Sequence, residues 1–259
     1  MSPEPIPFDA PVVERGFGFF ETLLLVGRKA VLWDAHVRRL LSTLTALELP
    51  APAPGVLEAG AREALVGIDD GAEERSLRLS WIAVGPDVES AASWRLDASV
   101  RSIPPNTLAR RGGSHAMTAP ERFRRDSSGF KSTSYFGAVA ALRHARRSGC
   151  DEALFRDGEL YVEGSSTGLV AWNGGRPAGL GPAGLPSVTA AAFLQGRGER
   201  RGLRREELLA GALLLGSLTT AAPILSLDGA ECARPADMLK AVEAFRERLR
   251  SDPSLQKPL

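Results

Sequence analysis

The pattern of hydrophobic and polar positions predicts a small unit of mixed helix and strand in the first part of the chain. Apolar residues recur three and four positions apart over Ala35–Leu47 and Val56–Val66, as on the buried side of a helix. Asp34 precedes the first of these segments and is a favourable helix N-cap. Apolar and polar residues alternate over Ser76–Val84, which predicts a strand, and Trp94–Val100 predicts another. These signals indicate an α+β arrangement.

The remainder of the chain is predicted to be larger and richer in strands. Asp157-Gly158 separates two short apolar runs and is a strong hairpin signal. Helical periodicity marks Ser134–Arg147 and Pro235–Arg250, and Leu213–Leu218 is typical of a buried strand. A stretch rich in Pro, Arg and Gly predicts a linker. We expect two domains, 1–105 and 114–259, joined by linker 106–113, with disorder only in the last eight or so residues.

Composition and charge narrow the classes of function. The formal net charge is +1, so no global field favours nucleic acid or an anionic membrane as a partner. No stacking aromatic residues or nucleic-acid-binding motif surround the basic run Arg122–Arg125, which is interpreted as a solvated loop. The most apolar run, Ala212–Leu218, is too short to span a bilayer. Two cysteines and an N-terminus unlike a signal peptide lead us to expect a cytoplasmic protein.

Two residues have the chemistry of a cofactor site. Lys131 lies near the start of a predicted helix, and lysine is the side chain that condenses with an aldehyde cofactor. Taken alone, such a lysine is usually a surface residue. Glu163 ends a predicted strand before a run of small hydroxyl residues, where a carboxylate can pair with a cofactor ring nitrogen. The ordinary alternative is a charge before a turn.

A third group of residues has the chemistry to bind a phosphate. Ser187, Val188 and Thr189 lie at a predicted helix N-terminus, where backbone amides and the helix dipole attract anions. Ser217 follows a glycine near a strand end, and Arg39 can offer a two-pronged guanidinium contact. A helix cap, a strand hydroxyl and a solvated arginine are the ordinary alternatives.

Other catalytic constellations find little support. His36, His115 and His144 lack metal-ligand spacing with Cys, Asp or Glu, so we expect no metal site. The sequence has no GxSxG, no Walker loop and no GxGxxG that opens a helix after a strand.

Taken together, these segments resemble the class IV aminotransferase family, the fold-type IV pyridoxal-phosphate enzymes, over most of the chain. Six of them follow one another in the family's order, which makes the resemblance specific. They are Gly16–Thr22, His36–Leu40, Lys131–Tyr135, Asp151–Leu154 with Glu163–Ser166, Leu185–Thr189, and Gly216–Leu218 with Pro223.

The resemblance implies a role for each matched residue. Lys131 is the Schiff-base lysine, Tyr135 lies beside the cofactor's phenolic oxygen, and Glu163 is the partner of the ring nitrogen. The implied phosphate ligands are Arg39, Val188, Thr189, Ser217 and Leu218. Pyridoxal 5'-phosphate is the implied cofactor.

The resemblance also implies a fold and an assembly. The fold is the two-domain, D-amino-acid aminotransferase-like one: a small N-terminal α/β sandwich and a larger C-terminal β-rich domain that binds the cofactor. A homodimer and a small-molecule amine substrate are implied as partners.

Four positions depart from the family pattern. Phe17 stands where Asp is usual, and Gly168 stands where an Asn follows the hydroxyl run. Ala190 follows Thr189 where Arg is common, and Val84 stands where an Arg is often found. These departures affect the expected substrate more than the expected cofactor.

Three functions remain open, and the favoured one is a 4-amino-4-deoxychorismate lyase that releases pyruvate and gives 4-aminobenzoate for folate biosynthesis. Thr22 matches a threonine that such lyases use near the leaving group, and Gly216-Ser217-Leu218 is similar to their Asn-Ser-Leu. The chain is also short for the family. The alternatives are an aminotransferase of branched-chain or D-amino acids and an inactive member that acts as a binding protein.

Overall fold

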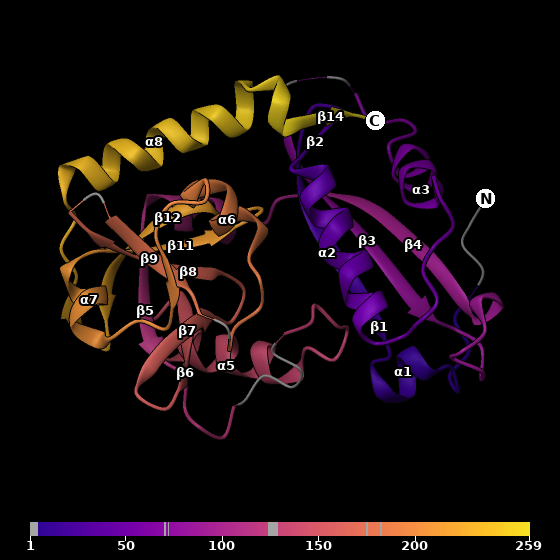
Figure 1. The fold of residues 1–259 in the computed structure, drawn as a ribbon, viewed down its shortest axis with the longest axis horizontal. Coiled ribbons are helices and arrows are strands. Elements are labelled where there is room, and N and C mark those ends of the chain that lie inside the picture. Colours follow the sequence, from indigo (N-terminus) through magenta and orange to yellow (C-terminus); the bar gives the residue numbers. More distant parts are fainter. Residues whose placement is uncertain (1–4, 70, 72, 124–128, 175, 182) are drawn as a thin grey trace. The chain divides into compact units, whose positions relative to one another are not determined.

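A computed structural model describes residues 5–69, 71, 73–123, 129–174, 176–181 and 183–259. The chain divides into two compact units (Figure 1). The first unit contains Met1–Ser102, Phe130–Tyr135 and Gln256–Leu259, and the second contains Ile103–Gly129 and Phe136–Leu255. We expected two domains joined by a single linker at 106–113. The observed division differs, because two short segments from the later part of the chain belong to the first unit.

The first unit is built on a five-stranded sheet with the order β14-β2-β1-β3-β4. Along its whole length β1 pairs with β3 in antiparallel register, and β3 pairs with β4 in the same way. Its helices are α1 (Pro11–Arg15), α2 (Trp33–Ala46) and α3 (Val56–Ala64), and its strands are β1 (Gly18–Val26), β2 (Lys29–Val31), β3 (Glu74–Ala83), β4 (Trp94–Ser102) and β14 (Gln256–Pro258).

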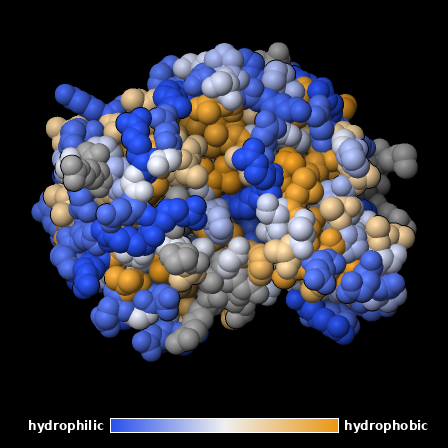
Figure 2. Space-filling view, in the orientation of Figure 1, coloured by the Kyte–Doolittle hydropathy of each residue, from blue (hydrophilic) through white to orange (hydrophobic). Residues whose placement is uncertain are grey.

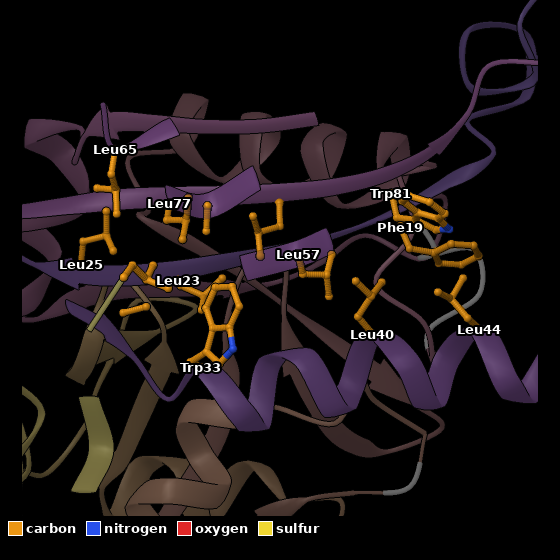
Figure 3. Close-up of a cluster of buried hydrophobic side chains, with 14 of the residues drawn as sticks. Phe19, Leu23, Leu25, Trp33, Leu40, Leu44, Leu57, Leu65, Leu77 and Trp81 are labelled. Carbon is orange, nitrogen blue, oxygen red and sulfur yellow. The ribbon is translucent and has the colours of Figure 1, made fainter. Parts of the chain in front are cut away.

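The core of the first unit lies between this sheet and its helices (Figure 3). Phe19, Leu23 and Leu25 alternate along β1 and belong to the same buried cluster as Leu40 and Leu44 of α2. The helix residues are four positions apart, so they share one face of α2. By the same alternation Glu21 also points to the core side of β1, where a charge needs partners.

Two expectations for the first unit are wrong. The residues after 251 are not a disordered tail: β14 pairs with β2, and Leu259 is buried in the core. Asp34 is not a helix N-cap, because α2 begins at Trp33 and its N-cap is Leu32, with a φ of 56°. The predicted N-cap lies two positions after the observed one, because the turn that follows β2 starts the helix earlier in the sequence.

The second unit contains a nine-stranded sheet with the order β10-β9-β8-β11-β12-β5-β6-β7, and β13 pairs with β12. A bridge between Tyr161 and Leu203 links β7 to the residues just after β10, so the two ends of this order meet. The strands are β5 (Ser114–Thr118), β6 (Glu152–Asp157), β7 (Leu160–Gly164), β8 (Gly168–Asn173), β9 (Arg176–Leu180), β10 (Glu199–Arg201), β11 (Ala212–Gly216), β12 (Thr220–Leu227) and β13 (Ala230–Glu231).

Helices surround this sheet, and α8 is the longest of those described (Figure 1). The part predicted as a linker forms a short helix and a tight turn rather than an extended connection. Leu218 lies beyond β11, which ends at Gly216. The elements are α4 (Pro105–Ala109), η2 (Arg110–Gly112), α5 (Phe136–Arg147), α6 (Val188–Leu194), α7 (Arg205–Ala210), α8 (Ala236–Ser251) and η3 (Pro253–Leu255).

The surface has the mixture expected from the composition. On the face seen in Figure 2, hydrophilic side chains cover most of the surface, and hydrophobic residues show in a few patches. Arg124 and Arg125 of the basic run lie outside the described residues. Across the part of the chain that the structure describes, no helix is long and apolar enough to cross a membrane.

Candidate active site

Lys131 belongs to the first unit because its segment pairs with the start of β1. The backbone amide of Phe20 donates to the Lys131 carbonyl at 2.9 Å, and the amide of Thr133 donates to the Gly18 carbonyl at 2.8 Å. Gly16 makes room for this approach: its φ is +63°, and a Cβ there would lie 3.1 Å from the Ser134 backbone. The first glycine of the Gly-Phe-Gly motif therefore serves the placement of Lys131.

The Lys131 amine lies among aromatic rings. Its Nζ is 4.7 Å from the centre of the Phe20 ring and 5.7 Å from that of Tyr135. The two rings meet edge to face, with centroids 5.5 Å apart. Aromatic rings replace part of the water around the amine, and their faces attract its ammonium form. The resemblance places Tyr135 near the same cofactor as Lys131, and the first unit brings the two together.

A buried charged cluster lies behind this site, and sequence reasoning missed its central residue. Glu21 on β1 is 1% exposed and accepts hydrogen bonds from Arg39 Nε at 2.8 Å and from a second guanidinium nitrogen of Arg39. His36 Nδ1 lies 2.7 Å from the same carboxylate. The sequence did contain a signal for this cluster: a carboxylate on the core side of a predicted strand, followed by a helix with the pattern His-x-x-Arg.

The cluster shifts the pKa values of its members. Burial alone raises the pKa of Glu21, but the hydrogen bonds and charges of His36 and Arg39 outweigh it and lower this pKa to about 2. Burial is the main cause that lowers the pKa of His36, and the charges of Arg39 and Lys131 add to it against the effect of Glu21. Glu21 is therefore ionised at neutral pH, and its charge is balanced by Arg39.

The pairing defines the position of Arg39, the implied phosphate ligand. Its side chain is 12% exposed, and two of its nitrogens are directed at Glu21. A bidentate pair of this kind fixes the plane of the guanidinium. The phosphate role of Arg39 remains a prediction, and Glu21, which also binds His36, helps to hold Arg39 in place.

Thr22, the predicted leaving-group contact, is half-buried on β1 and pairs with Arg78 of β3. Strand alternation puts its side chain on the same face as that of Phe20, which contacts Lys131. The first unit thus contains Lys131, Tyr135, Thr22 and Arg39.

The second unit contains the predicted partner of the ring nitrogen. Glu163 lies on β7, is 4% exposed and accepts a hydrogen bond from the Leu185 amide at 3.1 Å. Gly184 permits this close approach, since a Cβ there would lie 3.1 Å from the Val162 carbonyl oxygen. Glu163 also lines a cavity of about 460 Å³ with Phe155 and other residues of the second unit.

The departure at Gly168 has a structural explanation. A Cβ at Gly168 would lie 2.6 Å from both the Cβ and the Oγ of Ser187. Ser187 therefore occupies the space that a side chain at position 168 would need, which explains why glycine fits there.

Ser187 also explains the start of α6. Its Oγ accepts a hydrogen bond from the Ala190 amide at 3.2 Å, which is a regular N-cap. The amides of Val188 and Thr189 belong to the first turn, where helix geometry provides no carbonyl partner. Because the side chains of Val188 and Thr189 are buried, an anion at this helix start would bind to their backbone amides rather than to their side chains.

The last implied phosphate-binding turn joins β11 to β12. It contains Ser217 and Leu218, and it ends at Thr220, which has a φ of 61°. A β-branched residue in the left-handed region is uncommon and is found where surrounding structure holds it. Two nitrogens of Arg111 donate to the Leu218 carbonyl, at 3.0 and 2.6 Å.

Each unit contains groups suited to pyridoxal phosphate: the first has a lysine among aromatic rings, and the second has a buried carboxylate, a capped helix start and a strained turn. Among the residues that the structure describes, no group of three or more His, Cys, Asp or Glu side chains could hold a metal ion.

Comparison with known proteins agrees with this chemistry. The chain matches the family described as amino-transferase class IV over residues 18–227, and it belongs to that family. It is 29% identical over 248 residues to a Mycobacterium tuberculosis (strain ATCC 25618 / H37Rv) protein named bifunctional aminodeoxychorismate lyase / D-amino acid transaminase, with 85% of each chain covered.

Solved structures show the same fold. A hypothetical aminotransferase from Mycobacterium tuberculosis in its apo form has a TM-score of 0.84 at 26% identity, covering 97% of this chain and 95% of that one. Its PLP-bound form has a TM-score of 0.80 at 24% identity with the same coverage. The branched-chain amino acid aminotransferase of Escherichia coli, at 16% identity, has a TM-score of 0.81 and covers 98% and 93% of the two chains.

The protein is therefore a pyridoxal-phosphate-dependent enzyme with the fold-type IV architecture, as the resemblance implied. Its cofactor is pyridoxal 5'-phosphate.

Proposed function

We propose that the protein is a 4-amino-4-deoxychorismate lyase, which releases pyruvate and leaves 4-aminobenzoate, a precursor in folate biosynthesis. The observation that carries the proposal is the relationship, over 85% of both chains, to a protein named for this activity and for a D-amino acid transaminase activity. Thr22 and the Gly216-Ser217-Leu218 turn, which are similar to the lyase pattern, add support.

Lys131 moves the proton in the proposed reaction. When bound, pyridoxal phosphate supplies an electron sink for the pair left on the amine-bearing carbon. The amine of Lys131 takes the proton from that carbon as a general base. Loss of this proton and cleavage of the adjacent carbon–oxygen bond make the ring aromatic and expel enolpyruvate. The enolpyruvate gains a proton and becomes pyruvate.

Glu163 and Thr22 have supporting roles in this scheme. The Glu163 carboxylate keeps a proton on the ring nitrogen, and its hydrogen bond from the Leu185 amide fixes its orientation. The Thr22 hydroxyl donates a hydrogen bond to the oxygen of the leaving group. The resemblance suggests both roles, and burial of Glu163 keeps its contact out of water.

The second candidate is an aminotransferase of D-amino acids or branched-chain amino acids. The name of the Mycobacterium tuberculosis relative includes D-amino acid transaminase, which favours D-amino acids. This reaction needs an amino-group acceptor for turnover, whereas the lyase reaction does not.

The test is the visible spectrum of the purified holoenzyme while candidate amines are added without a keto acid. A lyase consumes aminodeoxychorismate over many turnovers, releases pyruvate and keeps its absorption band. An aminotransferase loses the band in one turnover and recovers it when a keto acid is added. That second outcome with aminodeoxychorismate left untouched would overturn the lyase proposal.

Thr22→Val provides a matched variant, because it removes the hydroxyl and keeps the shape. We expect pyruvate release to fall by about 100-fold or more, as for loss of a positioned proton donor, while the cofactor band is unchanged. Thr45→Val on the exposed side of α2 is the control. Equal activity of Thr22→Val and the control would remove Thr22 from the mechanism.

We also propose a homodimer, which the family resemblance implies. Light scattering on the holoenzyme should give twice the 27.5 kDa of one chain. A single-chain mass at assay concentration would contradict this.

A further inference from the structure

We propose that Arg110 and Arg111, adjacent residues of η2, are positioning residues for two cofactor-binding turns of the second unit. Arg110 acts through Glu152 on the turn that follows Glu163, and Arg111 acts on the carbonyl of Leu218. The inference depends on the assignment of these turns to the ring nitrogen and the phosphate of the cofactor. It assigns a role in the site to a segment that the sequence suggested was only a linker.

Arg110 and Glu152 form a buried ion pair. Arg110 is 6% exposed and Glu152 is fully buried, and Nη2 of Arg110 lies 2.6 Å from Oε2 of Glu152. Burial of two charges is unfavourable unless other hydrogen bonds satisfy the remaining lone pairs. The function of this ion pair therefore depends on the other groups that donate hydrogen bonds to the Glu152 carboxylate.

Glu152 is saturated by the hydroxyl run that follows Glu163. Ser166 donates to Oε2 at 2.9 Å, Thr167 donates to it at 3.0 Å, and Ser165 donates to Oε1. The Ala153 amide adds a further hydrogen bond at 3.1 Å. The three consecutive hydroxyls thus wrap around one carboxylate whose charge Arg110 balances.

This arrangement sets the end of β7. The Gly164 amide donates to the Thr167 carbonyl at 2.8 Å, and the Ser165 amide donates to the Ala153 carbonyl at 2.8 Å. A Cβ at Gly164 would clash with the Thr167 hydroxyl and come within 3.2 Å of Glu152, so only glycine fits the turn. Glu163, the preceding residue, is therefore attached directly to a turn whose shape depends on Glu152 and Arg110.

Arg111 holds the other turn from its carbonyl side. Both of its donated hydrogen bonds end on the Leu218 oxygen, at 3.0 Å from Nε and 2.6 Å from Nη2. In a trans peptide the carbonyl and the next amide point in opposite directions, so the Thr219 amide points away from Arg111. Arg111 therefore holds the Leu218 carbonyl on one side of the turn. The Thr219 amide faces the opposite side, where it can bind an anion.

A third arginine supports this arrangement. Arg246 of α8 donates to the Ala221 carbonyl at 2.6 Å and to the Arg111 carbonyl. It thereby connects the backbone of η2 to β12 just after the turn. With the Leu218 carbonyl and the Ala221 carbonyl both held, the left-handed conformation of Thr220 between them has little freedom to relax.

The two turns also lie against each other. A Cβ at Gly216 would lie 3.5 Å from the Ser166 carbonyl oxygen and from the Thr167 side chain. One short segment therefore fixes two neighbouring turns, through one side chain for each. This double attachment is more than a linker needs, and it explains why consecutive arginines occupy η2.

The experiment compares two ligands that differ only in the phosphate. Pyridoxine 5'-phosphate and pyridoxine are alcohols and cannot condense with Lys131, so their dissociation constants report non-covalent binding alone. Both are measured on cofactor-free protein by equilibrium dialysis, without substrate. Thermal unfolding of each variant is recorded alongside.

For Arg111→Met we expect affinity for pyridoxine 5'-phosphate to fall about 10-fold to 100-fold, the usual effect of losing a residue that orients a ligand-binding group. Affinity for pyridoxine should stay within about threefold, because the ring contacts remain. Arg143→Met, on the exposed side of α5, is the control and should change neither.

For Arg110→Lys we expect both ligands to weaken in parallel, because both use the ring nitrogen that Glu163 faces. Lysine keeps the charge beside Glu152 and so favours a folded variant, but it loses the geometry of the guanidinium. Parallel loss of both ligands in Arg111→Met, or unchanged affinity in either variant, would overturn the proposal.

The outcome is separable from that of the proposed reaction. A wild-type protein that binds pyridoxine 5'-phosphate but fails as a lyase leaves this inference standing. A wild-type protein that binds neither ligand would overturn the assignment of the turns and this inference with it.

Discussion

The buried carboxylate of Glu21 provides the sharpest test of the electrostatics of the site. Glu21→Gln keeps the shape of the side chain and removes its charge. Contacts with His36 and Arg39 lower the pKa of Glu21 from 4.5 to about 2 in the folded protein. A shift of one pKa unit corresponds to about 1.4 kcal/mol, so the ionised carboxylate contributes about 3 kcal/mol to stability at neutral pH.

The sign of the pH dependence follows from the direction of the shift. A folded pKa below the unfolded pKa gives stability that is present above pH 4.5 and is lost as the pH falls toward 2. At pH 3 about 1 kcal/mol of the contribution remains. The stability difference between wild type and Glu21→Gln should therefore shrink by about 2 kcal/mol between pH 7 and pH 3.

Urea unfolding of the cofactor-free protein measures this difference. Trp33, Trp81 and Trp94 belong to the core of the first unit, so their fluorescence reports its unfolding. Glu63→Gln, on the exposed side of α3, is the control and should change stability little. An equal stability difference at pH 3 and pH 7 would refute the reasoning.

Three further predictions follow from other parts of the structure. Lys131→Ala should abolish the visible band of covalently held cofactor, and a retained band would exclude Lys131 as its attachment point. Gly168→Ala should cost about 1–3 kcal/mol in thermal unfolding, since its Cβ meets Ser187, and Ser187→Gly in the same chain should restore most of this; additive losses would contradict the steric explanation. Deletion of residues 256–259 should lower the unfolding midpoint by removing β14 and the buried Leu259, worth about 2–3 kcal/mol for the side chain alone, whereas an unchanged midpoint would show that this strand contributes nothing.

Local patterns predicted the elements whose formation depends on their own residues. The helices α2, α3 and α8 and the hairpin over Asp157-Gly158 are all present in the structure. Periodicity and turn residues are local signals, and these elements satisfy them within a few positions. The six ordered motifs also identified the family, because their order is far more specific than any one of them.

Features that depend on distant contacts could not be predicted in this way. The C-terminal residues carry no strand signal of their own, and β14 exists because β2 offers an edge. The arginines of η2 lay in the predicted linker, and their contacts exist only because the fold brings Glu152 and Leu218 to them. Glu21 was visible within a motif, but only the fold shows that it faces the core beside Arg39.

The composition of the first unit has a consequence for synthesis of the protein. Its sheet is completed by β14, and the segment that contains Lys131 belongs to it as well. Residues 256–259 follow the whole of the second unit in the sequence, so the sheet of the first unit can be completed only after the second unit has been synthesised. Changes to residues 256–259 should therefore affect the sheet that is formed mainly by N-terminal residues.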